Sequence, residues 1–551
     1  MKTSKIKKIC SVVMAAMLGV SVLTGCGSSN SSSSTGASAQ ELTFNLGSDV
    51  KTLDPALNQA VDSSILLVNM FEGLYKLDEN QKAIPGVAEK CDISEDGKVY
   101  TFHLRSDAKW TNGEPVTAGD FEYAWKRVMD PNTAAEYAYQ MEYIKGAKEY
   151  TAGTGTADEV GVKAIDDSTL EVTLASPCAY FLELTAFPCY FPVDKKVVDG
   201  NDQWANSAET YVSNGPFKLA DYKIKDQVVL EKNDNYYGKD SVKLDKVNVK
   251  MVADETSAWA SYKAGQFDMV YSVPQSDVDA AVQDGSATTF PLLSSYYLSV
   301  NMTDSLNSID PEAAKALSNP KVRKALTLAI DRESLTANVV KSGSVAAFSL
   351  VPTGIKDTNG KDFSDKKYFD TKANVEEAKQ LLAEAGYPDG QGFPAATLLY
   401  NPEGGNGTVM QAIQDMWKSN LGIDIQLQSQ EWKVFIATRN AKDYELARDG
   451  WNADYVDPMT FLDMFQSTSG QNNSGYNNPE YDKLIDQVRT ETDSTKRFEL
   501  FRQAEDLLMT DLPIIPLYYK NQTMGVKSYI KDLEASPLGY IYFDKAYIEG
   551  K

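Results

Sequence analysis

The sequence contains a single histidine, His103, among its 551 residues. A Ser-His-Asp or Cys-His catalytic centre would have to use this imidazole. It lies between Phe102 and Leu104 in an alternating, strand-like segment, which favours a structural role. The chain also lacks the GxSxG motif of serine hydrolases and the GxxxxGK[ST] phosphate-binding loop. We therefore expect a protein that is not an enzyme and that uses no metal or cofactor.

Cysteine is scarce as well, with five residues and no CxxC pair, so no cysteine zinc site is indicated. Cys10 and Cys26 belong to the N-terminal segment discussed below. Of the remaining three, Cys178 and Cys189 are close enough in sequence to form a small disulfide loop. The alternative is that Cys91, Cys178 and Cys189 are simply small buried residues.

Basic residues are in deficit, since 54 Lys and Arg face 77 Asp and Glu, for a net charge of −23. Removal of residues 1–25, which hold four lysines and no acid, takes the charge to −27. This excess of negative charge disfavours nucleic acid as a partner and adhesion of the folded body to anionic lipid. The length favours two to four domains.

Residues 1–25 have the features of a targeting segment. A basic run, Lys2–Lys8, precedes the apolar residues 9–23, which are too few for a membrane span of about 20 residues. Leu23-Thr24-Gly25-Cys26 resembles the lipobox of bacterial lipoproteins, in which the cysteine becomes residue one and carries acyl chains such as palmitate. An ordinary secretory signal is the alternative. Residues 26–40 are Ser-rich and are expected to form a flexible tether.

The body mixes strand-like and helical patterns, which indicates a mixed α/β fold. Asn319 and Asn374 are placed to cap helices, the second with Glu377 in a capping box. Gly422 is placed to end a helix. The patterns predict strands over 42–46, 99–105, 169–174, 423–427 and 514–519, and helices from Pro320 and over 375–385, 408–421 and 494–510.

Several segments together resemble one family, the extracytoplasmic peptide-binding proteins of ABC importers (solute-binding family 5). Each segment is weak alone, but their order and spacing over residues 41–551 are specific. The resemblance is carried by 48–55 (SDVKTLDP), 71–74 (FEGL), 102–105 (FHLR), 108–121 (AKWTNGEPVTAGDF), 214–217 (NGPF), 323–326 (RKAL), 329–332 (AIDR), 383–387 (AEAGY) and 450–455 (GWNADY).

This resemblance implies a three-domain periplasmic-binding-protein clam-shell of type II, similar to cluster C, with two lobes and an extra inserted domain. The two crossovers between lobes, near residues 296 and 521, would form the hinge. Mapped by motif, domain I takes residues 41–71, 196–296 and 522–551, domain II takes 72–195, and domain III takes 297–521.

The implied function is capture of short peptides between the lobes and delivery to the permease subunits of an ABC importer. The protein would be a monomer outside the bacterial cell membrane, held only by the lipid on Cys26. Alternatives within the family are a dipeptide, a murein peptide, a pheromone or a nickel complex as ligand, the last disfavoured by the single histidine. A secreted peptidase is the alternative from another class.

A receptor that accepts many peptides must hold their backbone and termini, and the free amine is the best fixed handle. By the resemblance, Asp454, next to Trp451 and Asn452, would bind the α-amino group. Judged without the motif, Asp454 is one acid among 77 and equally a loop residue or helix cap. Gly450 and Asn452 on one lobe and Val61 on the other would pair with the peptide backbone.

Other positions match the family's pocket. Tyr137 is either a ligand contact or a half-buried core residue. Arg448 and Arg439 are candidates for the peptide's C-terminal carboxylate, with internal salt bridges as the alternative. Trp432 matches a pocket wall, unless it is simple core packing, and Asn401 matches a position near the pocket.

Two positions depart from the family pattern. Gln59 is neutral where some oligopeptide binders carry an acid, and Asn406 stands where some relatives have a histidine. These departures leave the preferred length and charge of the peptide open.

Overall fold

The structure is a computed structural model that describes residues 39–402 and 405–551. The chain divides into two units, residues 1–38 and residues 39–551. The expected signal segment, Cys26 and nearly all of the expected tether lie outside the described residues. The second unit carries the cavities and side-chain clusters that bear on function.

One sheet of eleven strands runs through the second unit. Its two longest strands, β12 (Ala287–Val300) and β17 (Ile514–Val526), are antiparallel neighbours in the middle of the sheet. The sheet order is β15 (Gln426–Ser429), β14 (Thr397–Tyr400), β16 (Leu446–Asn452), β12, β17, β11 (Met269–Val270), β1 (Glu41–Asn45), β10 (Lys246–Lys250), β9 (Gln227–Lys232) and β8 (Phe217–Lys223), and β13 (Val345–Ala346) also pairs with β17.

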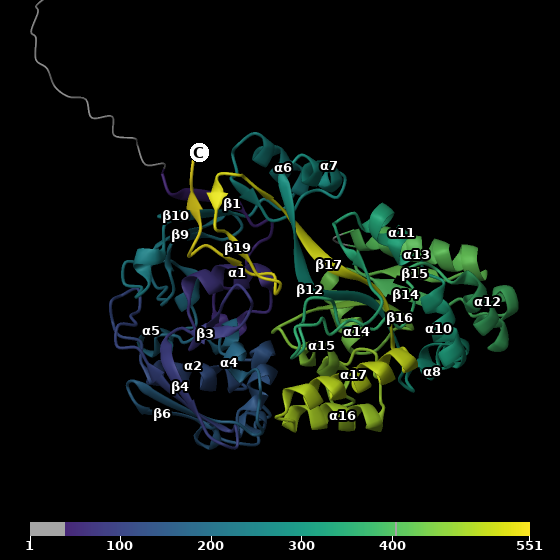
Figure 1. The fold of residues 1–551 in the computed structure, drawn as a ribbon, viewed down its shortest axis with the longest axis horizontal. Coiled ribbons are helices and arrows are strands. Elements are labelled where there is room, and N and C mark those ends of the chain that lie inside the picture. Colours follow the sequence, from purple (N-terminus) through teal and green to yellow (C-terminus); the bar gives the residue numbers. More distant parts are fainter. Residues whose placement is uncertain (1–38, 403–404) are drawn as a thin grey trace, which may run out of the picture. The chain divides into compact units, whose positions relative to one another are not determined.

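Strands β12 and β17 connect two groups of strands, one formed by β8 to β11 with β1 and the other by β14 to β16 (Figure 1). Their pairing is interrupted between Pro291 and Ser295, where the register shifts. Such an irregularity bends and twists the strands locally. The predicted crossovers near 296 and 521 fall within these two strands, and the domain boundaries themselves stay a prediction.

A separate antiparallel sheet of four strands lies in the segment predicted as domain II. Its order is β4 (Ala88–Ile93), β5 (Val99–Leu104), β7 (Thr169–Thr173) and β6 (Val162–Asp166). Helix α2 (Ala118–Met129) begins with a capping box between Thr117 and Asp120 and buries Phe121 and Trp125. The 3-10 segment η2 (Glu136–Tyr143) follows it in the chain and faces the large cavity described below.

The second group of strands is accompanied by most of the long helices (Figure 1). The expected caps form, because the side chain of Asn319 accepts a hydrogen bond from the Lys321 amide and that of Asn374 from the Glu377 amide. The helices here include α9 (Pro311–Leu317), α10 (Pro320–Leu328), α12 (Val375–Glu384), α13 (Asn406–Leu421), α14 (Trp432–Asn440), α16 (Pro479–Thr490) and α17 (Ser494–Asp511).

The predicted elements are confirmed with shifted ends. Helix α13 begins at Asn406 rather than Thr408 and stops at Gly422, whose φ of 72° places it in the left-handed region. Strand β17 is longer than predicted, because it continues past Tyr519 to Val526. Lys520, which lies in the added part of the strand, lines the cavity described below.

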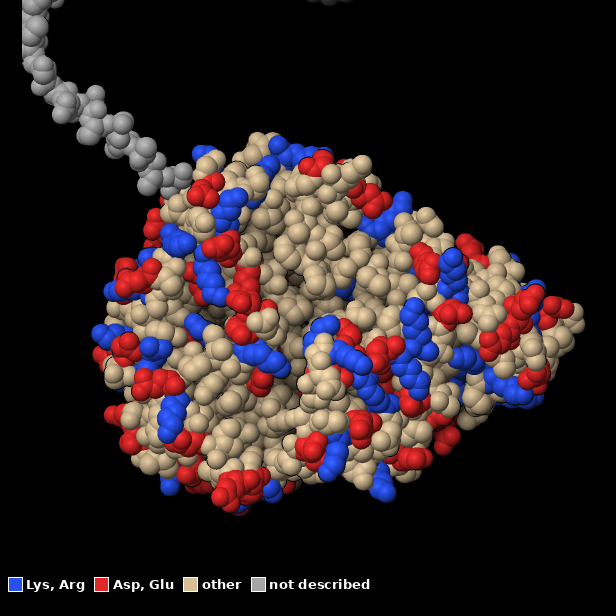
Figure 2. All heavy atoms as spheres, in the orientation of Figure 1, with Lys and Arg blue, Asp and Glu red and all other residues tan. Residues whose placement is uncertain are grey.

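The surface mixes both signs of charge. On the face drawn in Figure 2, basic side chains lie among acidic ones over both groups of strands, and no large basic patch is present on this face.

Candidate ligand-binding site

The main candidate site is a cavity of about 370 Å³ between η2, the start of α1 (Val61–Met70), β12, β16 and the end of β17. Every predicted ligand-binding residue except Asn401 lines this cavity. The predicted residues found there are Val61, Tyr137, Trp432, Arg439, Arg448, Gly450, Trp451, Asn452 and Asp454.

Strand β16 presents part of its backbone to this cavity. It pairs with β12 along its whole length, from Leu446 to Asn452. On its other side β14 pairs only with Leu446 and Ala447, so within the described part of the chain no strand covers 448–452 there. Gly450 lies so close to β12 that an added Cβ would stand 3.0 Å from the carbonyl oxygen of Ser295. Backbone groups along this open edge are available to an extended ligand.

Asp454 follows β16 directly and is only 8% exposed. Its carboxylate accepts hydrogen bonds from Tyr137 Oη at 3.4 Å, Tyr139 Oη at 3.3 Å and Gln140 Nε2 at 2.7 Å, all from η2. Among the described residues it forms no ion pair. Burial, together with the negative charge of Asp463, raises the pKa of Asp454 to about 7, against the opposing effect of these hydrogen bonds. An unpaired buried carboxylate of this kind attracts a cation.

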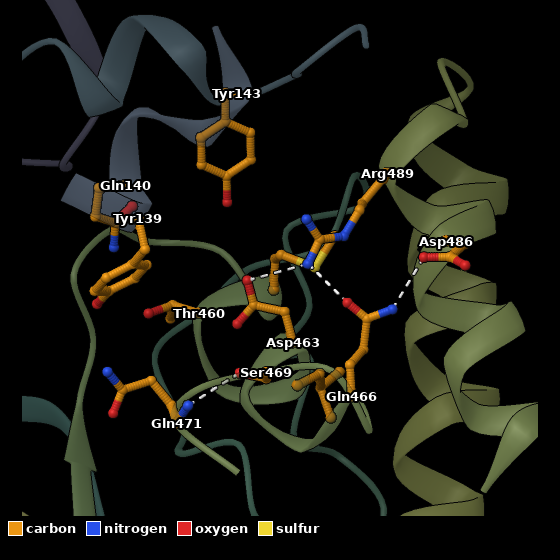
Figure 3. Close-up of polar contacts among 12 residues, drawn as sticks. Tyr139, Gln140, Tyr143, Thr460, Asp463, Gln466, Ser469, Gln471, Asp486 and Arg489 are labelled. Atoms are coloured by element: carbon orange, nitrogen blue, oxygen red, sulfur yellow. Dashed lines mark hydrogen bonds and ion pairs between the residues drawn. The ribbon is translucent and has the colours of Figure 1, made fainter. Parts of the chain in front are cut away.

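A second acid, Asp463 in η10 (Asp463–Phe465), is close enough to Asp454 for its charge to act on it, and its own contacts are drawn in Figure 3. Burial raises its pKa to about 6. Its nearest cation is Arg489 of α16, with Nη2 3.8 Å from Oδ2. Arg489 also donates to Gln466, which in turn donates to Asp486 at 3.0 Å (Figure 3), and none of these three residues lines the cavity. Asp463 therefore acts on Asp454 through charge and is absent from the cavity lining.

Positive charge gathers at the part of the cavity beside Tyr296. The guanidinium carbon of Arg448 and the ammonium of Lys520 lie 5.0 Å and 5.4 Å from the centre of the Tyr296 ring. Arg448 Nε donates to Tyr296 Oη at 3.1 Å. Neither cation forms an ion pair with any described residue, in contrast to Arg439, whose Nη1 lies 2.6 Å from Asp449. The internal salt bridge considered for the arginines therefore exists for Arg439 and is not seen for Arg448.

Aromatic side chains form further parts of the wall. Trp432, at the start of α14, is 40% exposed and faces the cavity, so simple core packing does not describe it. Trp451 Nε1 donates to Thr460 Oγ1 at 3.3 Å, and the same hydroxyl accepts the backbone amide of Asp454 at 3.1 Å. Tyr137 is half-buried and packs against Phe187, with ring centres 5.3 Å apart.

Asn401 lies outside the cavity lining. It is buried, and its Oδ1 accepts from Asn406 Nδ2 at 3.3 Å. Asn406 Oδ1 accepts a hydrogen bond from the hydroxyl of Tyr296, and that hydroxyl accepts one from Arg448 Nε. Asn401 therefore belongs to the layer behind the cation and does not face the cavity. Of the two departures from the family pattern, Gln59 lines the cavity and Asn406 does not.

Sequence reasoning missed Lys520, Tyr139 and Gln140. Lys520 is a charge that directly follows the apolar run of β17, and such a break in a buried strand was the available signal. Tyr139 and Gln140 meet Asp454 from more than 300 positions away in the chain. Only the tertiary structure brings these groups together.

The residues that other chemistries would require are not assembled. His103 lies in β5 and contacts Asp92 at 2.8 Å, away from the cavity lining. Cys91, Cys178 and Cys189 are free, which corrects the disulfide alternative. Across the residues that the structure describes, no cluster of three or more His, Cys, Asp or Glu side chains could hold a metal ion.

Comparison with known proteins identifies the family. The model of the bacterial extracellular solute-binding proteins, family 5, matches residues 82–473. The chain belongs to this family. It is 37% identical to the oligopeptide-binding protein OppA of Bacillus subtilis over 98% of this chain and all of that one.

Solved structures of family 5 relatives have the same fold. The substrate-binding domain of an oligopeptide ABC transporter from Bacillus anthracis is 34% identical, with a TM-score of 0.78 over 93% of this chain and 99% of that one. Listeria monocytogenes OppA bound to peptide is 32% identical, with a TM-score of 0.78 over 94% and 100%. These similarities confirm the predicted periplasmic-binding-protein fold. They also confirm the prediction that the chain is a solute-binding protein rather than an enzyme.

The family is extracellular, as its description states. No helix in the described ranges is both long and apolar enough to cross a membrane.

Proposed function

We propose that this chain is a lipid-anchored binding protein that captures short peptides and delivers them to the permease of an ABC importer. The observation that carries the proposal is the charge pattern of the cavity. An unpaired carboxylate, Asp454, follows one end of the open edge of β16, and an unpaired guanidinium, Arg448, lies at the other end of it. A peptide zwitterion has the complementary arrangement of charge.

In the proposed complex Asp454 accepts the peptide's α-ammonium group. Tyr137, Tyr139 and Gln140 already orient the carboxylate, so little reorganisation accompanies binding. Because the site is largely withdrawn from water, the charge-assisted hydrogen bond is stronger there than at an exposed position. The ammonium also removes the cost of holding an unpaired carboxylate in the interior.

The peptide backbone would lie along the open side of β16 and exchange hydrogen bonds with Gly450 and Asn452. Val61, at the start of α1, would hold the peptide from the opposite wall. Recognition through backbone groups does not depend on the ligand's side chains, which suits a receptor for many sequences.

The C-terminal carboxylate would meet Arg448, whose Nη groups have no partner among the described residues. An extended chain advances about 3.3 Å per residue, so the stretch from Arg448 to Asp454 corresponds to at most roughly 20 Å. Peptides of about three to five residues fit between the two charges. Arg439 would act indirectly, by holding Asp449 beneath the strand, while Trp432 and Trp451 line the side-chain space.

Attachment to the membrane is part of the same proposal. The lipobox-like segment ending in Cys26 supports lipidation, and residues 26–40 supply a tether between the lipid and the body. Metabolic labelling with a palmitate analogue would test it, with Cys26→Ser as the control. Label that persists in the variant would place the lipid elsewhere and contradict the anchor.

The binding proposal is tested by native mass spectrometry of the purified protein, because co-purified peptides remain in enclosed clefts. We expect adducts whose masses correspond to peptides of three to five residues with a free amine, and their loss from Asp454→Asn. Adducts that are non-peptide, or that carry a blocked N-terminus, would contradict the proposal.

A further inference from the structure

A second cavity of about 210 Å³ lies beside the main cavity, and Lys520 of β17 lines both of them. The two cavities share Val61, Ser294, Asn452, Lys520 and Leu538 in their walls, so the second opens from the first. Its remaining wall is mostly apolar. The lining residues unique to it are Tyr271, Leu292, Leu293, Asn521, Gln522, Pro537 and Gly539.

Lys520 is the one charged residue among those lining the second cavity. It is half-buried, and it makes neither a hydrogen bond nor an ion pair with any residue in 39–402 or 405–551. The ring of Tyr296 lies 5.4 Å from its ammonium, and the guanidinium of Arg448 adds a second positive charge nearby. A partly desolvated ammonium without an anion is unfavourable, and this cost is relieved when a carboxylate arrives.

The polar amides near Lys520 are already engaged. Gln522 Nε2 donates to the carbonyl oxygen of Tyr271 at 2.5 Å, and Asn521 Nδ2 donates to that of Gly343 at 2.6 Å. The ammonium of Lys520 is thus the charged donor that this cavity offers to an occupant. The apolar walls, including Leu292, Leu293 and Leu538, suit the methylene stem of a side chain that ends in the charged group.

The balance of charges in the main cavity also indicates that Lys520 lacks a partner. Arg439 is neutralised by Asp449. In the complex proposed above, on which this step rests, the α-ammonium neutralises Asp454 and the terminal carboxylate neutralises Arg448. Lys520 then remains as an uncompensated positive charge, so a peptide without an acidic side chain would leave the closed site with one unpaired cation.

We propose that the second cavity is a side-chain subsite for an acidic residue of the peptide, read by Lys520. The chain therefore selects, among short peptides, those that carry a glutamate or aspartate where the peptide passes this cavity. Glutamate is preferred over aspartate because its longer apolar stem fills more of the wall.

The test compares pairs of peptides that differ only in Glu against Gln. Tetrapeptides of alanine carry one or the other at position 2, 3 or 4, and affinities are measured by isothermal titration calorimetry on the full protein. At one position the Glu peptide should bind roughly tenfold more tightly than its Gln partner. That ratio should fall close to one in Lys520→Met and return in Lys520→Arg, which keeps the charge.

A free C-terminus offers the same carboxylate chemistry, so each pair is also measured with an amidated C-terminus. The Glu-to-Gln ratio should persist in the amides, although both amides bind more weakly. If Lys520→Met weakens the Glu and Gln free acids equally and leaves their amides unchanged, Lys520 reads the terminal carboxylate and the side-chain subsite is wrong.

Equal binding of every Glu and Gln pair, or a ratio that survives Lys520→Met, overturns the subsite while leaving peptide binding intact. Failure of all the peptides to bind would overturn both the subsite and the proposed function.

Discussion

Replacement of Asp454 by asparagine is the sharpest test of how the site works. The amide keeps the size of the side chain and one carbonyl acceptor but removes the charge that would meet the peptide's ammonium group. Loss of one partner of a buried, hydrogen-bonded charge pair costs about 2–5 kcal/mol. Affinity for a short peptide should therefore fall by roughly 30-fold to several thousand-fold.

The assay is calorimetric titration of Ala-Ala-Ala-Ala into wild type and Asp454→Asn. Asp463→Asn is the matched control, since Asp463 carries the same substitution in the same region but does not line the cavity. We expect the control to bind at least as tightly as wild type at neutral pH. Binding by Asp454→Asn within about threefold of wild type would show that the ammonium is held elsewhere.

The dependence of peptide affinity on pH should have a defined direction. The ammonium pairs with the ionised carboxylate, and the pKa of Asp454 in the ligand-free state is about 7. Affinity should then fall by up to about tenfold for each pH unit below 7. The other titratable groups facing Asp454 are Tyr137, Tyr139, Cys189 and Tyr540, which stay neutral in this range, and Asp463, which titrates near 6. An acid limb that remains in Asp454→Asn would assign it to another group.

Three further outcomes follow from the structure. Because burial raises the pKa of Asp454, this acid takes up a proton on folding, and its contribution to stability decreases as pH rises from about 4 to 7. At pH 7, Asp454→Asn should therefore have a higher Tm than wild type by calorimetry, and a lower Tm would contradict this. Arg448→Gln should weaken binding of free-carboxylate peptides about tenfold or more and of their amides far less, which an equal loss for both would refute. Asp457→Asn leaves Arg497 buried without the partner it meets at 2.7 Å, so unfolding in urea should show a loss of about 3–5 kcal/mol, whereas the exposed Asp424→Asn should change little.

Local signals in the sequence were sufficient for several helix caps and stops, whereas strand β16 was not among the strands they predicted. Side-chain caps such as Asn319 and a left-handed stop at Gly422 depend on neighbours a few positions away, and these form as predicted. The cavity wall around Gly450 and Asp454 was found through a motif that includes its neighbours. Asn401 matched the same family pattern, yet it lies one layer back, since sequence similarity does not tell which way a side chain points.

The missed residues were missed for two different reasons. Lys520 was excluded by reading β17 as a buried strand that ended at Tyr519, although the strand continues and turns its polar end toward the cavity. Gln140 acquires its role only because η2 is folded against the loop that follows β16. The contacts of Tyr139 and Gln140 depend on the whole tertiary arrangement, so no short segment contains a signal for them, whereas the charge that follows the apolar run of β17 was a local signal for Lys520.

In the proposed function, the position of Asp454 would couple ligand binding to closure of the lobes. The carboxylate follows β16 in one group of strands, whereas its three donors come from η2 in the segment predicted as domain II. Closing these parts over an empty site buries an unpaired charge, which opposes closure. An ammonium group in the site converts that opposition into an attraction, since it binds the closed arrangement far better than an open one. On this proposal the ligand would stabilise the closed form in proportion to how completely its charges match the cavity, and a peptide that also satisfied Lys520 would stabilise it most.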